Sequence, residues 1–200
     1  MTMRSHDLQA VIDAAQAAFA ARATDPASRD CQSRAFAALA DAHGPSDLTG
    51  ERLPVCDHWL PTVLDTAGYP EDLRRLIEAF RAVEPAVSWQ RRGGPTPSAS
   101  HDFAEGHANA VLVGANGIEP RDDVWLGASL LAPGVRYPDH THPPEEVYLV
   151  LGPGQFSQEN GPWFEPGLGG TFYNRPGILH AMQATSEPLF AFWLLRADST

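Results

Sequence analysis

The chain contains no lysine, so arginine supplies all of its positive side-chain charge. Its 200 residues carry 14 basic and 25 acidic side chains, which gives a formal net charge of −11 at pH 7. An acidic protein of this kind is repelled by phosphate backbones and by anionic lipid headgroups. We therefore expect neither nucleic acid nor a membrane as a partner, whereas a cationic small molecule would not be repelled.

Cysteine and long apolar runs are scarce as well. Cys31 and Cys56 are the only cysteines, and two thiols far from the histidine-rich part of the chain indicate neither a disulfide framework nor a thiolate metal site. No apolar run is long enough to span a bilayer, and Asp7, Gln9 and Asp13 interrupt the segment in which a signal peptide would need a continuous apolar core. The sequence therefore predicts a cytoplasmic protein.

Helical spacing dominates residues 1–90. Apolar residues three and four positions apart predict helices over residues 5–22, 26–42 and 71–83. The segment 45–70 is rich in Pro, Gly, Asp and Thr, and we expect irregular chain there with a short helix at most. Two hundred residues suit one domain with one core, so this helical N-terminal region should pack on the rest of the chain.

The pattern changes after residue 90. Residues 91–107 have the Gly, Pro and Ser content of a loop or linker. Residues 108–200 then show short apolar runs separated by Gly and Pro turns, which predict an antiparallel barrel or sandwich. The runs are residues 110–113, 124–131, 147–151, 154–157, 170–173 and 189–195. The predicted fold class is thus mostly β with an α-helical N-terminal part.

The residues with most chemistry lie together in the second half of the chain. His140 and His142 stand two positions apart, as do Glu146 and Tyr148, and in an extended chain residues at this spacing point to one face. His180 follows a Pro-Gly turn and could add a third imidazole. Two nitrogen ligands, one carboxylate and a remote nitrogen are typical of a mononuclear metal site with open positions.

These residues resemble the motifs of the cupin family. The first cupin motif reads Gly, five residues, His-x-His, three or four residues, and Glu. Its positions are matched here by Gly134, His140, His142 and Glu146.

The second cupin motif ends in Gly-x-x-His, which Gly177 and His180 fit. The sequence departs from the family pattern at Arg175, where a proline is expected, and at Ala184, where an asparagine is usual. The closing glycine of the first motif would fall at Pro153. The resemblance implies a cupin fold, which is a double-stranded β-helix or jelly-roll barrel.

The layout narrows the resemblance further. A helical first half, a cupin second half, and a tyrosine two positions after the ligand carboxylate are similar to the cupin-type dimethylsulfoniopropionate (DMSP) lyases, closest to their Q-type (DddQ-like) branch. This implies one divalent metal ion, for which zinc, iron, manganese, cobalt and nickel are all candidates. The implied ligands are His142, Glu146 and His180, with His140 either a further ligand or a neighbour.

The resemblance also implies a carbon–sulfur lyase that acts on DMSP. Tyr148 corresponds to the family's catalytic tyrosine, Tyr137 to a second pocket tyrosine, and Trp125 to a tryptophan of the preceding strand. In this interpretation Tyr148 removes the proton α to a carboxylate bound by the metal, and β-elimination gives dimethyl sulfide and acrylate. Trp125, Tyr137 and Trp193 could surround the sulfonium.

Other interpretations of the same residues remain. The histidines could merely hydrogen-bond, and Tyr148 could be an ordinary strand tyrosine. Tyr137 could be a rim residue or an alternative base, and Trp125 and Trp193 could belong to the core. Glu145 is expected to be solvated, on the opposite face from Glu146. Because fold and metal do not fix the reaction, a cupin dioxygenase or isomerase and a non-catalytic small-molecule-binding cupin are alternatives. The helical region could cover a barrel edge or form a homodimer contact.

Overall fold

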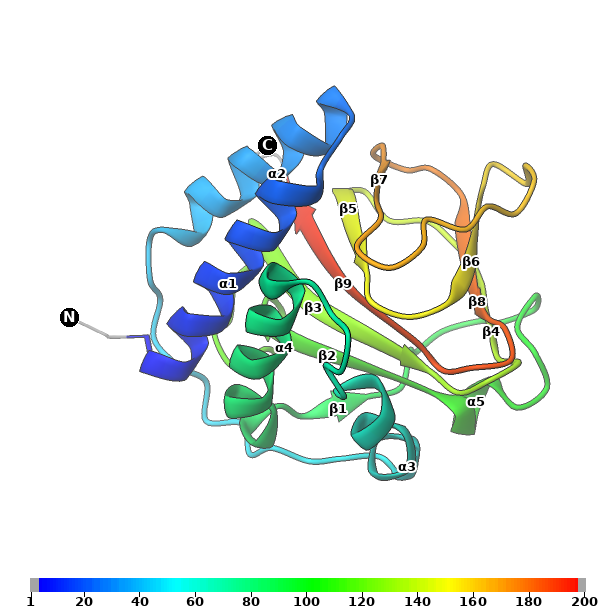
Figure 1. Cartoon of the computed structure of the whole chain (residues 1–200), viewed down its shortest axis with the longest axis horizontal. Helices are drawn as coiled ribbons and strands as arrows, with labels where there is room; N and C mark the ends of the chain where they lie inside the picture. The colour runs from blue at the N-terminus through cyan, green and yellow to red at the C-terminus, as the bar shows by residue number, and fades with distance from the viewer. Residues whose placement is uncertain (1–3, 198–200) are drawn as a thin grey trace.

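The computed structural model describes residues 4–197 as a layer of helices packed against a β-barrel (Figure 1). The helices are α1 (His6–Arg22), α2 (Pro26–Leu39), α3 (Pro54–Val63), α4 (Glu71–Val83), the 3-10 turn η1 (Glu84–Ala86) and α5 (Phe103–Gly106). Side-chain caps start the first two helices, since Ser5 accepts from the backbone N–H of Leu8 and Asp25 accepts from that of Ser28. Across the described residues, none of the helices is long and apolar enough to cross a membrane.

The strands form two antiparallel sheets. They are β1 (Trp89–Gln90), β2 (His107–Val113), β3 (Val124–Leu131), β4 (Arg136–His140), β5 (Glu145–Val150), β6 (Gly154–Gln158), β7 (Thr171–Asn174), β8 (His180–Ala184) and β9 (Leu189–Arg196). The larger sheet has the order β1-β2-β3-β9-β5-β7, and the smaller has the order β4-β8-β6. Together they make a cupin barrel with an α-helical N-terminal part, which confirms the predicted fold class.

Three strands lie outside the predicted apolar runs: the short β1, and β4 and β8, which form most of the smaller sheet. Strands β4 and β8 are polar where they approach the barrel mouth, and Pro138 interrupts β4. Pairing across the sheet holds them, with Tyr137 opposite Met182 and His140 opposite His180. Strands of this kind are specified by their partners rather than by their own hydrophobicity.

The helices also depart from expectation in detail. Helix α2 ends at Leu39 rather than at residue 42. Within the segment 45–70, where we expected a short helix at most, α3 covers Pro54–Val63 and has Pro61 inside it. The short helix α5 lies within residues 91–107, and its following strand already begins at His107.

Two groups of buried side chains lie on opposite sides of the larger sheet. One joins the helices to the outer face of the sheet, where Phe80 of α4 meets Phe192 of β9 edge to face at 5.3 Å between ring centroids. The other fills the barrel and includes Tyr137, Tyr148 and Trp193. Alternation along the strands therefore sends one set of side chains to the helices and the other into the barrel.

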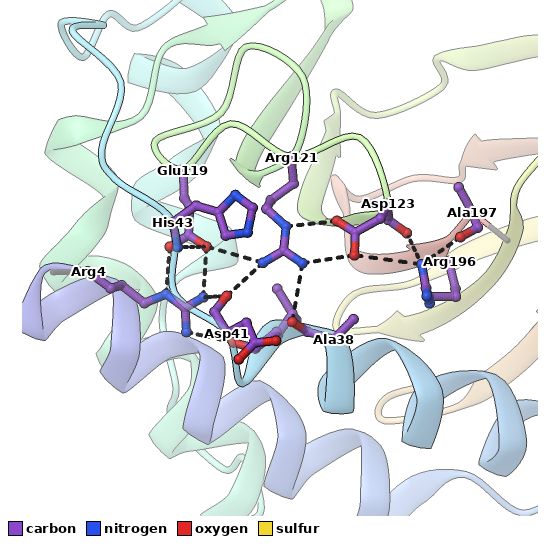
Figure 2. A network of polar contacts seen from close by, with 10 residues as sticks. Arg4, Ala38, Asp41, His43, Glu119, Arg121, Asp123, Arg196 and Ala197 are labelled. Atoms are coloured by element: carbon purple, nitrogen blue, oxygen red, sulfur yellow. Dashed lines mark hydrogen bonds and ion pairs between the residues drawn. The ribbon is translucent and has the colours of Figure 1, made fainter. Parts of the chain in front are cut away.

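A buried network of arginines and carboxylates connects the helical layer with the β2–β3 loop and β9 (Figure 2). Arg4 donates to both carboxylate oxygens of Glu119, at 2.6 and 2.8 Å, and these side chains are 3% and 1% exposed. Arg121 donates to both oxygens of Asp123, at 2.7 and 2.8 Å. Arg196 donates to the backbone carbonyl of Asp123 at 2.6 Å. Loss of Glu119 would leave the buried guanidinium of Arg4 without its counter-ion.

We expect Glu119→Ala to lower the free energy of unfolding by about 3 kcal/mol, because it strands the buried guanidinium of Arg4. The matched control is Glu78→Ala, which removes the exposed partner of Arg74 on α4 and should change stability by no more than about 0.5 kcal/mol. Urea unfolding followed by circular dichroism measures both. Equal effects of the two substitutions would contradict a stabilising role for the buried network.

Candidate metal centre and substrate cavity

Three imidazoles converge at the mouth of the barrel. His140 ends β4, His142 lies in the turn that leads to β5, and His180 begins β8 opposite His140. One ring nitrogen of each lies within 4.8 Å of the others, and the His140 and His180 ring centroids are 4.0 Å apart. This triad could hold a metal ion.

The protonation of the three rings is set by the backbone. The Nδ1 atom of each faces the carbonyl of a residue two positions away, at 2.9 Å for His140, 2.9 Å for His142 and 3.0 Å for His180. A carbonyl can only accept, so in the neutral ring Nδ1 carries the proton and Nε2 presents a lone pair. The Nε2 atoms of His142 and His180 are buried and, within the described chain, lack a hydrogen-bond partner. Such lone pairs fit metal ligation.

The carboxylate of Glu146 lies beside these lone pairs. Its Oε2 atom is 3.4 Å from Nε2 of His142 and 3.3 Å from Nε2 of His180. Asn174 on β7 donates to the same oxygen at 2.9 Å, and Gln158 on β6 donates to the side-chain oxygen of Asn174 at 2.7 Å. The contacts from Gln158 to Asn174 and from Asn174 to Glu146 fix the orientation of the carboxylate, as hydrogen-bond partners of metal ligands do.

The cluster favours a cation. Burial alone would raise the pKa of Glu146, but the imidazoles of His142 and His180 hold it well below its usual range. Burial, with a smaller contribution from His180, lowers the pKa of His140 to about 3. Burial opposes protonation of His142 as well, yet Glu146 outweighs it and raises the pKa of that imidazole. The site thus combines an anionic carboxylate with at least one neutral imidazole.

A cavity of about 340 Å³ opens beside the cluster, a size common among small-molecule sites. His140, His142 and Glu146 line it, together with Tyr148, whose ring stacks on Phe172 at 5.1 Å between centroids. The remaining aromatic side chains that line it are Trp125, Tyr137 and Trp193. The candidate metal ligands and several aromatic rings therefore line the same cavity.

Both tyrosines of the cavity are neutral in the protein alone. Burial, followed by the negative charge of Glu146, raises the pKa of Tyr148 well above its ordinary value. Burial raises the pKa of Tyr137 to about 12, against the opposing effect of a hydrogen bond from Asn109. A phenolate at either position would therefore need additional positive charge nearby.

The structure brings all the side chains singled out from the sequence to one place. Around this cavity and cluster lie His140, His142, Glu146, Tyr148, His180, Tyr137, Trp125 and Trp193. Their proximity does not test the role predicted for each.

The expectation for Glu145 was wrong. It does lie on the opposite face of β5 from Glu146, but it is buried at 6% exposure instead of solvated. Arg34 of α2 forms an ion pair with it at 2.5 Å, and the Tyr173 hydroxyl donates to it at 2.8 Å. The helical layer covers this face of the strand, which the sequence pattern alone did not reveal.

Several polar residues of the site were missed. Arg91 and Arg92 line the cavity, although we predicted a loop or linker for their segment. Asn109 on β2 and Ser129 on β3 line it as well. Asn109 is a single amide between alanines in an apolar strand, which is a usable signal for an inward polar residue. The contact of Asn174 with Glu146 had no such signal, because it depends on strand pairing.

Comparison with known proteins identifies the family. A family model for dimethylsulfoniopropionate lyase matches residues 27–191, which leave out α1 and the end of β9 but include the other helices and most of the barrel. The chain belongs to the dimethylsulfoniopropionate lyase family. The dimethylsulfoniopropionate lyase DddQ of Ruegeria pomeroyi is 28% identical to it over 165 residues, which cover 82% of this chain and 80% of the relative.

Solved structures agree with this assignment. The crystal structure of the DMSP lyase DddQ from Ruegeria pomeroyi DSS-3 aligns with a TM-score of 0.74 and 26% identity, covering 98% of this chain and 93% of that one. A chain from the crystal structures of the DMSP lyases RdDddP and RnDddQII has a TM-score of 0.69 at 24% identity, with 96% and 92% covered. The second likeness shows the shared fold.

We expect His180→Ala to weaken Zn²⁺ binding by at least about 100-fold, since even outer-shell changes cost 10- to 100-fold. Competition with a chromophoric chelator measures the affinity, and circular dichroism checks folding. The matched control is His101→Ala, because His101 is exposed and lies outside the cluster. Unchanged affinity in a folded His180→Ala protein would remove this imidazole from the metal centre.

Proposed function

We propose that the chain cleaves DMSP to dimethyl sulfide and acrylate by β-elimination. The chain belongs to the DMSP lyase family, and one observation supports the proposal most directly. A buried cluster of imidazoles and a carboxylate lies at the same cavity as Tyr148 and several aromatic rings. A metal ion held by the cluster would bind the anionic end of a substrate. The rings suit a cationic end.

The proposed ligands for one divalent ion are His140, His142, Glu146 and His180. This donor set accepts zinc, iron, manganese, cobalt or nickel, with availability deciding among them. When bound, such an ion supplies Lewis acidity toward the substrate carboxylate and positive charge that favours the phenolate of Tyr148.

Tyr148 is the proposed base. It lies two residues after Glu146, so both side chains point from β5 into the barrel, and its ring is held against Phe172. As the phenolate, its oxygen takes the proton from the carbon α to the carboxylate and becomes a phenol again. The electrons of that bond form the carbon–carbon double bond, the bond from the β-carbon to sulfur breaks, and its electrons leave with dimethyl sulfide.

The sulfonium end of DMSP has no hydrogen to donate, so an aromatic face is its fitting partner, at roughly 0.5–2 kcal/mol per contact. Trp125 and Trp193 come from the neighbouring strands β3 and β9, and both line the cavity. We propose these two rings as the partners of the sulfonium, and Tyr137 as a third aromatic residue that binds the substrate. The cytoplasmic location and the homodimer stay predictions.

Tyr148→Phe should reduce turnover by about 10³-fold, since it removes the proposed base, while binding of metal and substrate changes little. Headspace measurement of dimethyl sulfide under anaerobic conditions, with and without a chelator, gives the rate. The matched control is Tyr69→Phe, because the Tyr69 hydroxyl contacts the Leu151 carbonyl outside this cavity.

Three results would contradict parts of the proposal. Retained turnover in Tyr148→Phe would exclude this residue as the base. A wild-type protein that releases no dimethyl sulfide would exclude the lyase activity. A requirement for oxygen would favour the alternative of a cupin dioxygenase.

A further inference from the structure

A chain of hydrogen bonds crosses the wall of the cavity from one sheet to the other. Trp193 on β9 donates through Nε1 to Oγ of Ser129 on β3, at 3.1 Å. Ser129 donates to Oδ1 of Asn109 on β2, at 2.7 Å. Asn109 donates through Nδ2 to the hydroxyl of Tyr137 on β4, at 3.2 Å. All four side chains line the cavity.

The first two contacts give the direction of this chain. An indole N–H can donate but cannot accept, so Ser129 accepts from Trp193. In the structure Ser129 gives its own hydroxyl proton to Oδ1 of Asn109. This contact fixes the amide of Asn109 with its oxygen toward Ser129 and its NH₂ group toward Tyr137. The Tyr137 hydroxyl is therefore an acceptor in this chain.

A tyrosine hydroxyl that accepts one hydrogen bond still has a proton to donate. Within residues 4–197 no group accepts that proton, since the hydroxyl forms its hydrogen bond with the NH₂ group of Asn109. Because the side chain lines the cavity, the proton is available to a molecule bound there.

The orientation of Trp193 is itself built into the sheet. Where β3 pairs with β9, the residue directly opposite Trp193 is Gly127 on β3. A Cβ atom at position 127 would overlap the indole atoms Cζ2 and Cη2. The indole therefore lies over the backbone of Gly127 with its N–H at Ser129, which is 3% exposed.

We propose that Asn109 and Ser129 are positioning residues that hold the Tyr137 hydroxyl as a hydrogen-bond donor to the substrate carboxylate. The inference rests on the proposed function. The carboxylate oxygens are the only hydrogen-bond acceptors that DMSP possesses, so an O–H group in this cavity has one kind of partner on the substrate. Negative charge grows on those oxygens as the α-proton leaves, so the contact strengthens in the transition state.

A double-mutant cycle tests the coupling. Ser129→Ala frees the amide of Asn109 to turn its oxygen toward Tyr137 and capture the proton. We expect kcat to fall about 10-fold with KM changed by less than about 3-fold, and Tyr137→Phe to lower kcat by about 100-fold. In the Tyr137→Phe background, Ser129→Ala should then change kcat by less than about 2-fold.

The matched control for Ser129 is Ser157→Ala. Ser157 is a buried strand serine on β6 that donates to the Gly161 carbonyl outside the cavity. Its substitution should leave kcat within about 2-fold of wild type, because a single lost hydrogen bond away from the site affects stability instead.

A second variant tests the same chain with almost no change of shape. Asn109→Asp offers two acceptor oxygens, one to Ser129 and one to Tyr137, so it reverses the last contact. We expect it to lower kcat about as much as Tyr137→Phe and to add less than about 2-fold in that background. The inference would be overturned if Ser129→Ala or Asn109→Asp lowered kcat by the same factor in the Tyr137→Phe background as in the wild-type protein.

Binding separates this inference from the proposed function. Calorimetry with the trimethylammonium analogue of DMSP, which keeps the carboxylate and the cationic end, reports on the donor without turnover. Asn109→Asp should weaken its binding when Tyr137 is present and not in Tyr137→Phe. Weakening of equal size in both backgrounds would overturn the inference, whereas a wild-type protein that binds the analogue but does not cleave DMSP would refute only the lyase activity.

Discussion

A buried carboxylate is stable only when its charge and its lone pairs have partners, and the structure around Glu146 follows from this requirement. His142 and His180 supply the adjacent imidazoles, and Asn174, itself held by Gln158, supplies the hydrogen bond. These groups come from four separate segments. The barrel must therefore be closed before the carboxylate can be satisfied, which makes the site and the fold parts of one cooperative structure.

The helical layer contributes to the site through the reverse side of the same strand. Glu146 faces the barrel, while its neighbour Glu145 faces the helices and is held by Arg34 and Tyr173. Consecutive residues of β5 are thus anchored in opposite directions. The cavity wall is fixed from outside as well as from inside, so the helices are more than a cover for the apolar face of the sheet.

Much of this could be predicted from the sequence. The period-two spacing of His140, His142 and Glu146 is local, and it predicted the converging side chains because an extended chain has little freedom in where it points them. The pairing of β4 with β8 was not predicted, because neither strand belongs to the longer apolar runs, although the extended chain at His140 and His142 was expected. The hydrogen-bond chain that ends at Tyr137 was also missed, since it joins residues of four strands whose register only the folded barrel defines.

The glycine at position 127 has a consequence for how this cavity can change over time. The indole of Trp193 occupies the space that any larger residue there would need. A Cβ atom at position 127 would also overlap the backbone carbonyl oxygen of Ala110 on β2, so a smaller residue at position 193 would not by itself make room for one. The glycine is therefore held from two sides, by the indole and by the backbone of β2, and this part of the cavity wall keeps its shape whatever the neighbouring side chains become.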